Sequence, residues 1–137
     1  MDLQVLGNNA VVAKYVLQKL TTEEKNHALQ VIADALIGHA CYILKENEKD
    51  LENGRNNGMH PGMLDRLQLT SARIEAMAEG LKQIAELEDP IGECLEAYER
   101  PNGLYIEKRR VPMGVIGIIY ESRPNVTADA FGLCFKS

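Results

Sequence analysis

One stretch decides the fold: Val115-Ile116-Gly117-Ile118-Ile119-Tyr120-Glu121-Ser122-Arg123-Pro124-Asn125. Its first half is continuously apolar and rich in β-branched side chains, which is typical of a strand covered on both faces. Polar residues follow abruptly, and Pro124 then breaks the chain. A helix can begin near Thr127, with Asp129 favourable in its first turn. A buried strand, a polar loop and a helix start predict the opening of an α/β unit, and ligands of such sheets bind at this loop.

The residues before this stretch, 1 to about 92, have the periodicity of helices. The first apolar stripe consists of Leu3, Leu6, Ala10, Ala13, Leu17 and Leu20. A second helix is predicted to begin at a capping box of Thr21 and Glu24 and to bend or break at Gly38. Its expected buried face consists of Leu29, Ile32, Ala33, Leu36 and Ala40.

A further helix is predicted to start at Thr70 or Ser71, because either hydroxyl can cap it. Its apolar face consists of Ile74, Met77, Ala78, Leu81, Ile84 and Ala85. Asp89-Pro90 ends it. Asn102-Gly103 then lies between two runs that can be strands, which predicts a β-hairpin. The basic run at residues 108–110 indicates a solvated strand edge.

Composition narrows the functional classes. The 137 residues are 45% hydrophobic and 26% charged, as in an ordinary globular domain. A net charge of −5 without a basic stripe argues against nucleic acid as a partner. No apolar run reaches the roughly 18 residues that cross a membrane, and no signal peptide is apparent. A single parallel strand cannot form a sheet alone, so we expect the front part of a larger protein.

Cysteine and histidine give no sign of a metal site or a disulfide. Cys41, Cys94 and Cys134 are widely spaced, which favours a reduced, cytoplasmic compartment and burial as small hydrophobic side chains. The three histidines have no ligand spacing, so we expect surface or capping roles for His27, His39 and His60.

Residues 109–127, RRVPMGVIGIIYESRPNVT, resemble the signature of the gamma-glutamyl phosphate reductases, also called glutamate-5-semialdehyde dehydrogenases, of the aldehyde dehydrogenase superfamily. Four upstream motifs resemble the same family in the same order: Met63-Leu64-Asp65-Arg66-Leu67, Leu69-Thr70, Ala72-Arg73 and Asp89-Pro90-Ile91-Gly92. The resemblance thus covers nearly the whole chain. It implies an α/β fold with a helical segment over residues 1–92, a β-hairpin oligomerisation arm over 93–113, and over 114–137 the first strand and helix of an incomplete NADP-binding domain like that of aldehyde dehydrogenases.

The family resemblance also implies an activity. Gamma-glutamyl phosphate is reduced by NADPH to glutamate 5-semialdehyde, with release of phosphate, in proline biosynthesis. The family uses a cysteine nucleophile that forms a thioester. We expect that cysteine beyond residue 137, so this chain alone is expected to be inactive. The implied partners are further copies of the enzyme and the upstream glutamate kinase, with no nucleic acid and no membrane.

The same resemblance assigns roles to the loop. Asn125 is the candidate for the catalytic amide that binds the oxyanion of the tetrahedral intermediate; the alternative is a cap for the helix at Thr127. Arg123 can bind a substrate phosphate or carboxylate bidentately, or form a structural pair with Glu121 or another acid. Glu121 and Ser122 line the expected cofactor crevice. Tyr120 forms either its wall or plain core.

Two other interpretations remain open. The chain can be a non-catalytic helical interaction module derived from the family, or a piece that self-associates through its hairpin. The intact loop at residues 121–125 favours descent from a working enzyme. The residues encoded after Ser137 would discriminate between them.

Overall fold

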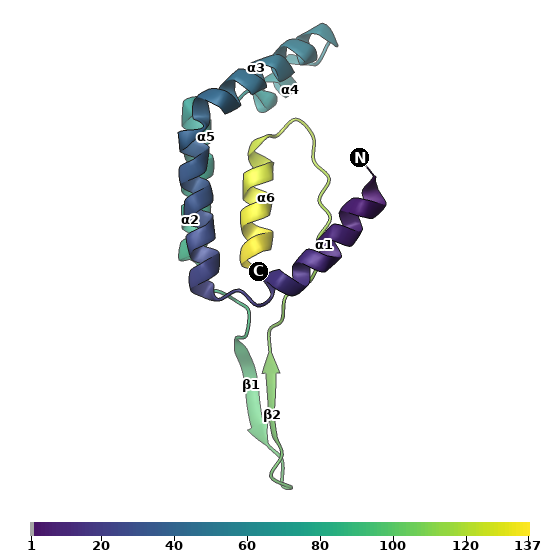
Figure 1. Ribbon diagram of the computed structural model, residues 1–137, viewed down its shortest axis with the longest axis vertical. Helices are drawn as coiled ribbons and strands as arrows, with labels where there is room; N and C mark the ends of the chain where they lie inside the picture. Colours follow the sequence, from purple (N-terminus) through teal and green to yellow (C-terminus); the bar gives the residue numbers. More distant parts are fainter. Residues whose placement is uncertain (1) are drawn as a thin grey trace.

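The computed structural model describes residues 2–137; residue 1, the first of the expected helical segment, lies outside the described residues. The helices are α1 Leu3–Leu17, α2 Thr22–Gly38, α3 Ala40–Asn56, α4 Pro61–Leu67, α5 Ser71–Glu86 and α6 Asn125–Lys136. The strands are β1 Cys94–Glu99 and β2 Tyr105–Arg109. The predicted order of helices, hairpin and C-terminal helix is confirmed (Figure 1).

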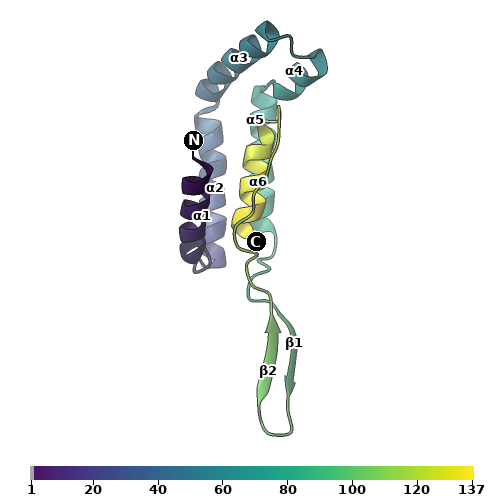
Figure 2. The same cartoon turned by 90° about the vertical axis from the view of Figure 1, so that its right-hand side faces the viewer.

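The core lies where α5 packs between α2 and α6. Its largest fully buried side chains are Leu29, Ile74 and Leu81. The α5–α6 contact is close at Gly132, where a Cβ atom would lie 2.7 Å from Leu81 Cδ2 and 2.9 Å from Ile84 Cδ1. Figure 2 shows α5 and α6 side by side. Glycine therefore permits this approach without displacing either side chain.

Local chemistry starts the helices as predicted. The Thr21 hydroxyl accepts a hydrogen bond from the Glu24 N–H at 3.2 Å, and the Glu24 carboxylate accepts from the Thr21 N–H at 2.8 Å. Thr70 caps α5 by accepting from the Arg73 N–H at 3.2 Å. The break at Gly38 is confirmed, since α2 ends there and α3 continues at an angle of 68°.

No single described helix has the length and apolarity to cross a membrane. Only α2 and α3 taken together, across their bend, meet that test, and they do so by length and composition alone.

The hairpin extends away from the helices (Figures 1 and 2). Strands β1 and β2 are antiparallel, and Gly103 takes a φ of +80° in the turn between them. Nearly all of its residues are exposed, including the basic run, where Arg109 pairs with Glu107 and Arg110 with Glu93, each at 2.7 Å. Among the described residues each strand has one unpaired edge.

Three expectations about burial are wrong. Residues 115–120 do not form a strand, and Ile119 is fully exposed, because a strand needs a ladder partner and the sheet formed by residues 2–137 contains β1 and β2 only. Helix α1 forms as predicted, yet none of its residues is buried. The three cysteines are exposed, on α3, β1 and α6, so none of them is a buried hydrophobic side chain.

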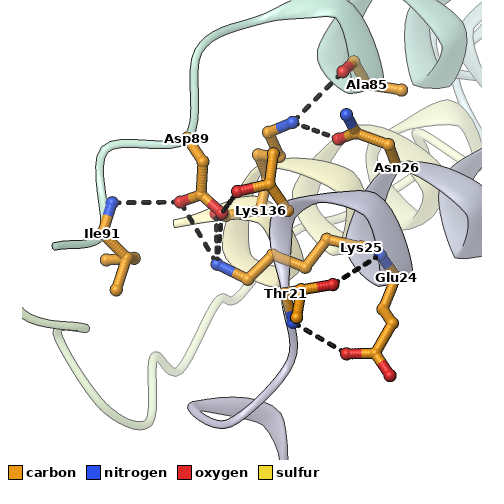
Figure 3. A network of polar contacts seen from close by, with 9 residues as sticks. Thr21, Glu24, Lys25, Asn26, Ala85, Asp89, Ile91 and Lys136 are labelled. Carbon is orange, nitrogen blue, oxygen red and sulfur yellow. Dashed lines mark hydrogen bonds and ion pairs between the residues drawn. The ribbon is translucent and has the colours of Figure 1, made fainter.

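A buried polar network holds three segments together at the base of the hairpin (Figure 3). Lys25 on α2 forms an ion pair with Asp89 at 2.9 Å, and the two side chains are 6% and 8% exposed. The same carboxylate accepts hydrogen bonds from the Thr22 hydroxyl at 3.1 Å and the Ile91 N–H at 3.0 Å. The start of α2 is thereby joined to the connection between α5 and β1.

The end of α6 joins this network through Lys136. The Lys25 ammonium donates to the Lys136 carbonyl at 3.3 Å. The Lys136 ammonium donates to the Ala85 carbonyl at 3.1 Å and to the Asn26 side chain. Both lysines are buried, so these bonds replace the water that each charge gives up.

The protonation of Asp89 is linked to folding. Burial alone raises the pKa of Asp89, but hydrogen bonds from Ile91, Lys25 and Thr22, together with the Lys25 charge, bring it below its ordinary value of 3.8. Burial lowers the pKa of Lys136, against the opposing charge of Asp89. Because the folded pKa of Asp89 lies below the unfolded one, the network stabilises the fold fully above the unfolded pKa. That stabilisation is lost as the pH falls through the folded pKa.

We therefore expect Asp89→Asn to reduce the free energy of unfolding at pH 7 by about 3 kcal/mol, because it leaves the buried Lys25 charge without its partner. The variant is also expected to lose stability less steeply below pH 4 than the wild type. Thermal unfolding measured across pH 2–7 checks both. Asp34→Asn is the control: its carboxylate is 72% exposed and 3.4 Å from Lys82, and its loss is expected to cost less than about 1 kcal/mol. Equal effects of the two substitutions would contradict the prediction.

Candidate functional site

An open pocket of about 420 Å³ lies between the α4–α5 connection and the start of α6. This volume is in the range of small-molecule sites, roughly 300–1,000 Å³. Its polar lining consists of Asp65, Arg66 and Gln68 from α4 and the connection, Arg73 from α5, Arg123 from the loop, and Asn125 and Asp129 from α6. The pocket therefore combines three arginines, two carboxylates and two amides.

Two of the five predicted site residues, Arg123 and Asn125, line this pocket. The other three do not. The Tyr120 hydroxyl instead forms a 2.6 Å hydrogen bond with the Thr127 hydroxyl, and the tyrosine is half exposed, so it is not core. Glu121 is exposed, and Ser122 is partly buried.

The loop before α6 is held in one conformation. Ser122 has a φ of +50°, the left-handed region that costs an ordinary residue about 1 kcal/mol. The bond from Tyr120 to Thr127 ties the start of the loop to the first turns of α6. Backbone conformations of this kind are concentrated at functional sites, where the surrounding structure enforces them.

Asn125 is the first residue of α6, and no side-chain hydrogen bond caps this helix. The alternative role of Asn125 as a cap is therefore wrong. Its amide nitrogen donates to the Asp129 carboxylate at 3.0 Å. An asparagine amide has two N–H groups, so the second remains for a ligand. The prediction of Asp129 in the first turn is wrong, because α6 begins at Asn125 and has no acidic residue in its first turn; Asp129 instead orients the amide.

The three arginines of the pocket differ in their partners. The Arg73 guanidinium donates to the carbonyl groups of Asp65 and Gln68 and to the Asp65 carboxylate, the last at 3.3 Å. Within residues 2–137, the side chains of Arg66 and Arg123 make no hydrogen bond or ion pair. The expected pair between Arg123 and Glu121 is thus not formed, and both guanidinium groups are free for an anion.

Asn47 on α3 fixes the opposite side of the α4–α5 connection. Its amide donates to the Leu67 carbonyl at 2.9 Å and accepts from the Leu69 N–H at 2.7 Å. The residue is 5% exposed. Asn47 and Arg73 therefore clamp the backbone of residues 65–69 from two sides. No local signal in the sequence marks this clamp, because Asn47 lies in a polar stretch among solvated neighbours.

The histidines take modest roles. His60 caps α4, since its Nδ1 accepts from the Gly62 N–H at 3.1 Å, which confirms a capping role. No group of three or more His, Cys, Asp or Glu side chains within residues 2–137 is arranged to hold a metal.

The cofactor roles of Tyr120, Glu121 and Ser122 stay a prediction, since none of these residues lines the pocket of Arg123 and Asn125. A second pocket, of about 230 Å³, lies between α1, residues 112–114 and α6, and it too excludes Tyr120, Glu121 and Ser122. Residues 115–120, which precede them, lie half exposed or more. The described residues therefore do not fit NADPH by themselves.

Comparison with known proteins places this geometry in a class of enzymes. No family model matches the chain. It is 56% identical over 136 residues to a curated protein of Anoxybacillus flavithermus and 54% identical to one of Desulforamulus reducens, covering 99% of this chain and 33% of each relative. A crystal structure from Thermotoga maritima matches with a TM-score of 0.96 and 40% identity, and one from Saccharomyces cerevisiae with 0.92 and 36%.

The two solved structures, from a bacterium and from yeast, share this fold. Each of the four relatives is named gamma-glutamyl phosphate reductase, and the chain is homologous to the N-terminal part of that enzyme. The family resemblance is thereby confirmed, as is a mostly helical N-terminal part with a two-stranded antiparallel hairpin. The chain spans about one third of the length of the relatives, 33% of the Thermotoga structure and 35% of the yeast one.

The clamp on residues 65–69 leads to a prediction. Asn47→Ala is expected to reduce the free energy of unfolding by about 2 kcal/mol, because it leaves the buried Leu69 N–H without an acceptor. Hydrogen exchange of the Leu69 amide is expected to accelerate more than that of core amides in α5. Asn53→Ala, an exposed site on the same helix, is the control and is expected to change neither quantity. Unchanged exchange at Leu69 would argue against the clamp.

Proposed function

We propose that this chain supplies one wall of the active site of a gamma-glutamyl phosphate reductase. The complete enzyme reduces gamma-glutamyl phosphate to glutamate 5-semialdehyde and releases phosphate, as a step of proline biosynthesis in the cytoplasm. The observation that carries the proposal is the pocket: Arg123 and Asn125, from the loop whose sequence resembles the family signature, face a polar wall formed by α4 and α5.

The two loop residues have separate roles in this proposal. Asn125 donates its free amide N–H to the oxygen that becomes negative in the tetrahedral intermediate, where one such donor contributes about 3 kcal/mol. Asp129 holds that amide in position through the 3.0 Å hydrogen bond. Arg123 binds the acyl phosphate, because a planar guanidinium matches two phosphate oxygens at once.

The remaining parts of the reaction come from outside this chain. The proposed hydride donor is NADPH, which supplies the electron pair for reduction when it is bound in the complete enzyme. The nucleophilic cysteine is also expected beyond residue 137. We therefore propose that residues 1–137 alone do not turn over the substrate. A non-catalytic interaction module is the alternative, and the free Arg123 and oriented Asn125 favour the enzyme.

The hairpin is proposed to join copies of the enzyme. A two-stranded hairpin is marginally stable on its own, and its unpaired edges are templates for another strand. Leu95, Tyr98, Leu104 and Tyr105 are exposed on it, at 40–63%. Pairing with a second subunit would cover both the edge and these side chains. The upstream glutamate kinase stays a proposed partner on the resemblance alone.

Activity is tested in a chimera, defined here as the Anoxybacillus flavithermus reductase with its matching third replaced by this chain. We expect the chimera to oxidise glutamate 5-semialdehyde in the reverse, phosphate-dependent direction, and residues 1–137 alone to be inactive. Asn125→Ala is expected to reduce kcat by about 100-fold with a smaller change in KM, since the bond to the oxyanion strengthens in the transition state.

The matched control for Asn125 is Asn8→Ala. Asn8 is an exposed asparagine on α1 whose side chain also makes one hydrogen bond to a residue four positions away, at 3.3 Å from Gln4. We expect it to leave kcat unchanged. A normal kcat for the Asn125 variant would remove this residue from the mechanism. An inactive wild-type chimera that is correctly folded would contradict the proposed function.

Oligomerisation is tested by removing the hairpin. The Glu93 carbonyl accepts from the Arg110 N–H at 3.0 Å, so the base of the hairpin is closed and residues 94–109 can be replaced by a short glycine linker. Light scattering at micromolar concentration is expected to show an oligomer for the chimera and a smaller species for the deletion. A monomeric chimera would contradict the role of the hairpin.

A further inference from the structure

The loop does not account for all the charge in the pocket. Arg66 lines the pocket from α4, which lies well before the family signature loop in the sequence. Its guanidinium has no hydrogen-bond or ion-pair partner among residues 2–137. Asp129 lines it from α6 and accepts one amide hydrogen bond, from Asn125, but it has no cationic partner within the same residues. In the proposed chemistry at the acyl phosphate, Arg66 has no role, and Asp129 only orients Asn125.

The unpaired charges of the pocket indicate which charged groups a complementary ligand would carry. Arg73 and Asp65 form an ion pair at 3.3 Å, so the groups of the pocket without an ionic partner within residues 2–137 are the guanidinium groups of Arg66 and Arg123 and the carboxylate of Asp129. The complementary ligand carries two anionic groups and one ammonium. If Arg123 takes the phosphate, Arg66 and Asp129 are left for a carboxylate and an ammonium, the zwitterionic head of an α-amino acid.

Arg66 is also held on a rigid support. It is one residue from Asp65 and two from Gln68, whose carbonyl groups accept from Arg73. On the other side, Asn47 binds the backbone of Leu67 and Leu69. The clamp fixes the backbone that carries the exposed Arg66, so that only the side-chain rotamers remain to be ordered when its guanidinium binds an anion.

We propose that Arg66 binds the α-carboxylate of the substrate and Asp129 its α-ammonium group, so that this pocket selects an α-amino acid over simpler acyl compounds. This inference rests on the proposed function for the identity of the substrate. In this proposal the specificity of the pocket comes from two residues: Arg66 recognises the α-carboxylate of the ligand, and Asp129 recognises its α-amino group.

The test is calorimetric binding to the chimera, which needs no turnover. Three probes are used: L-glutamate; 4-aminobutanoate, which is glutamate without its α-carboxylate; and glutarate, which is glutamate without its amino group. We expect Arg66→Gln to weaken L-glutamate about 10- to 100-fold and to leave 4-aminobutanoate unchanged, since the loss of a charge-assisted bond affects only the ligand that makes it. Asp129→Asn is expected to weaken L-glutamate and 4-aminobutanoate but not glutarate.

Two further variants serve as controls for geometry and for charge. Arg66→Lys retains the charge without the bidentate geometry and is expected to fall between the wild type and Arg66→Gln. Arg55→Gln removes the same charge from the surface of α3, where Arg55 pairs with Glu48 at 3.1 Å, and is expected to leave the three affinities unchanged. Thermal midpoints establish that each variant folds.

The outcomes separate this inference from the proposed function. Equal weakening of L-glutamate and 4-aminobutanoate by Arg66→Gln, or no binding of L-glutamate by the folded wild-type chimera, would overturn the assignment of Arg66. An active chimera with that result would leave the reductase function in place. The chimera can also be inactive while Arg66→Gln abolishes its preference for L-glutamate over 4-aminobutanoate. That result would support the amino-acid pocket and contradict the proposed reaction.

Discussion

The ion pair between Lys25 and Asp89 is the constraint on which the arrangement of this chain depends. It joins three segments that are distant in sequence: the start of α2, the connection that leads from α5 into the hairpin, and, through the Lys136 carbonyl, the end of α6. Helix α6 packs on α5 with no space for a side chain at Gly132. The pocket lies at the other end of α6, so Asn125 and Asp129 reach it only because both the packing and the network hold this helix in place.

The sequence predicted what local chemistry controls. Thr21 with Glu24, Thr70 and the Asn102-Gly103 turn each act over a few residues, and the structure has them as expected. The loop before α6 was also identified, because the change from apolar to polar residues is local. The predicted burial of residues 115–120 is wrong for the opposite reason. Whether a strand forms depends on its neighbours in a sheet, and no pattern within the strand can supply those neighbours.

The same distinction applies to the candidate site. Arg123 and Asn125 were found because they lie in one recognisable run of sequence. Arg66 and Asn47 were not given a role, since their significance comes from contacts across roughly 20 residues or more and from the absence of competing partners around a pocket. Asp129 was predicted to place favourable charge in the first helical turn, whereas α6 begins earlier, at Asn125, and Asp129 accepts a hydrogen bond from that residue's amide. Side-chain geometry, rather than composition, separates these cases.

The exposure of the three cysteines matters for how samples of this protein age. Cys94 is the first residue of β1, on the element proposed to meet another copy, and its sulfur is open to solvent. Exposed thiols are the ones that air converts to disulfides between molecules. A sample kept without reductant would accumulate disulfide-linked molecules through any of the three exposed thiols, and those joined at Cys94 would be linked through the hairpin. Only fully reduced protein therefore reports whether copies associate without a covalent link.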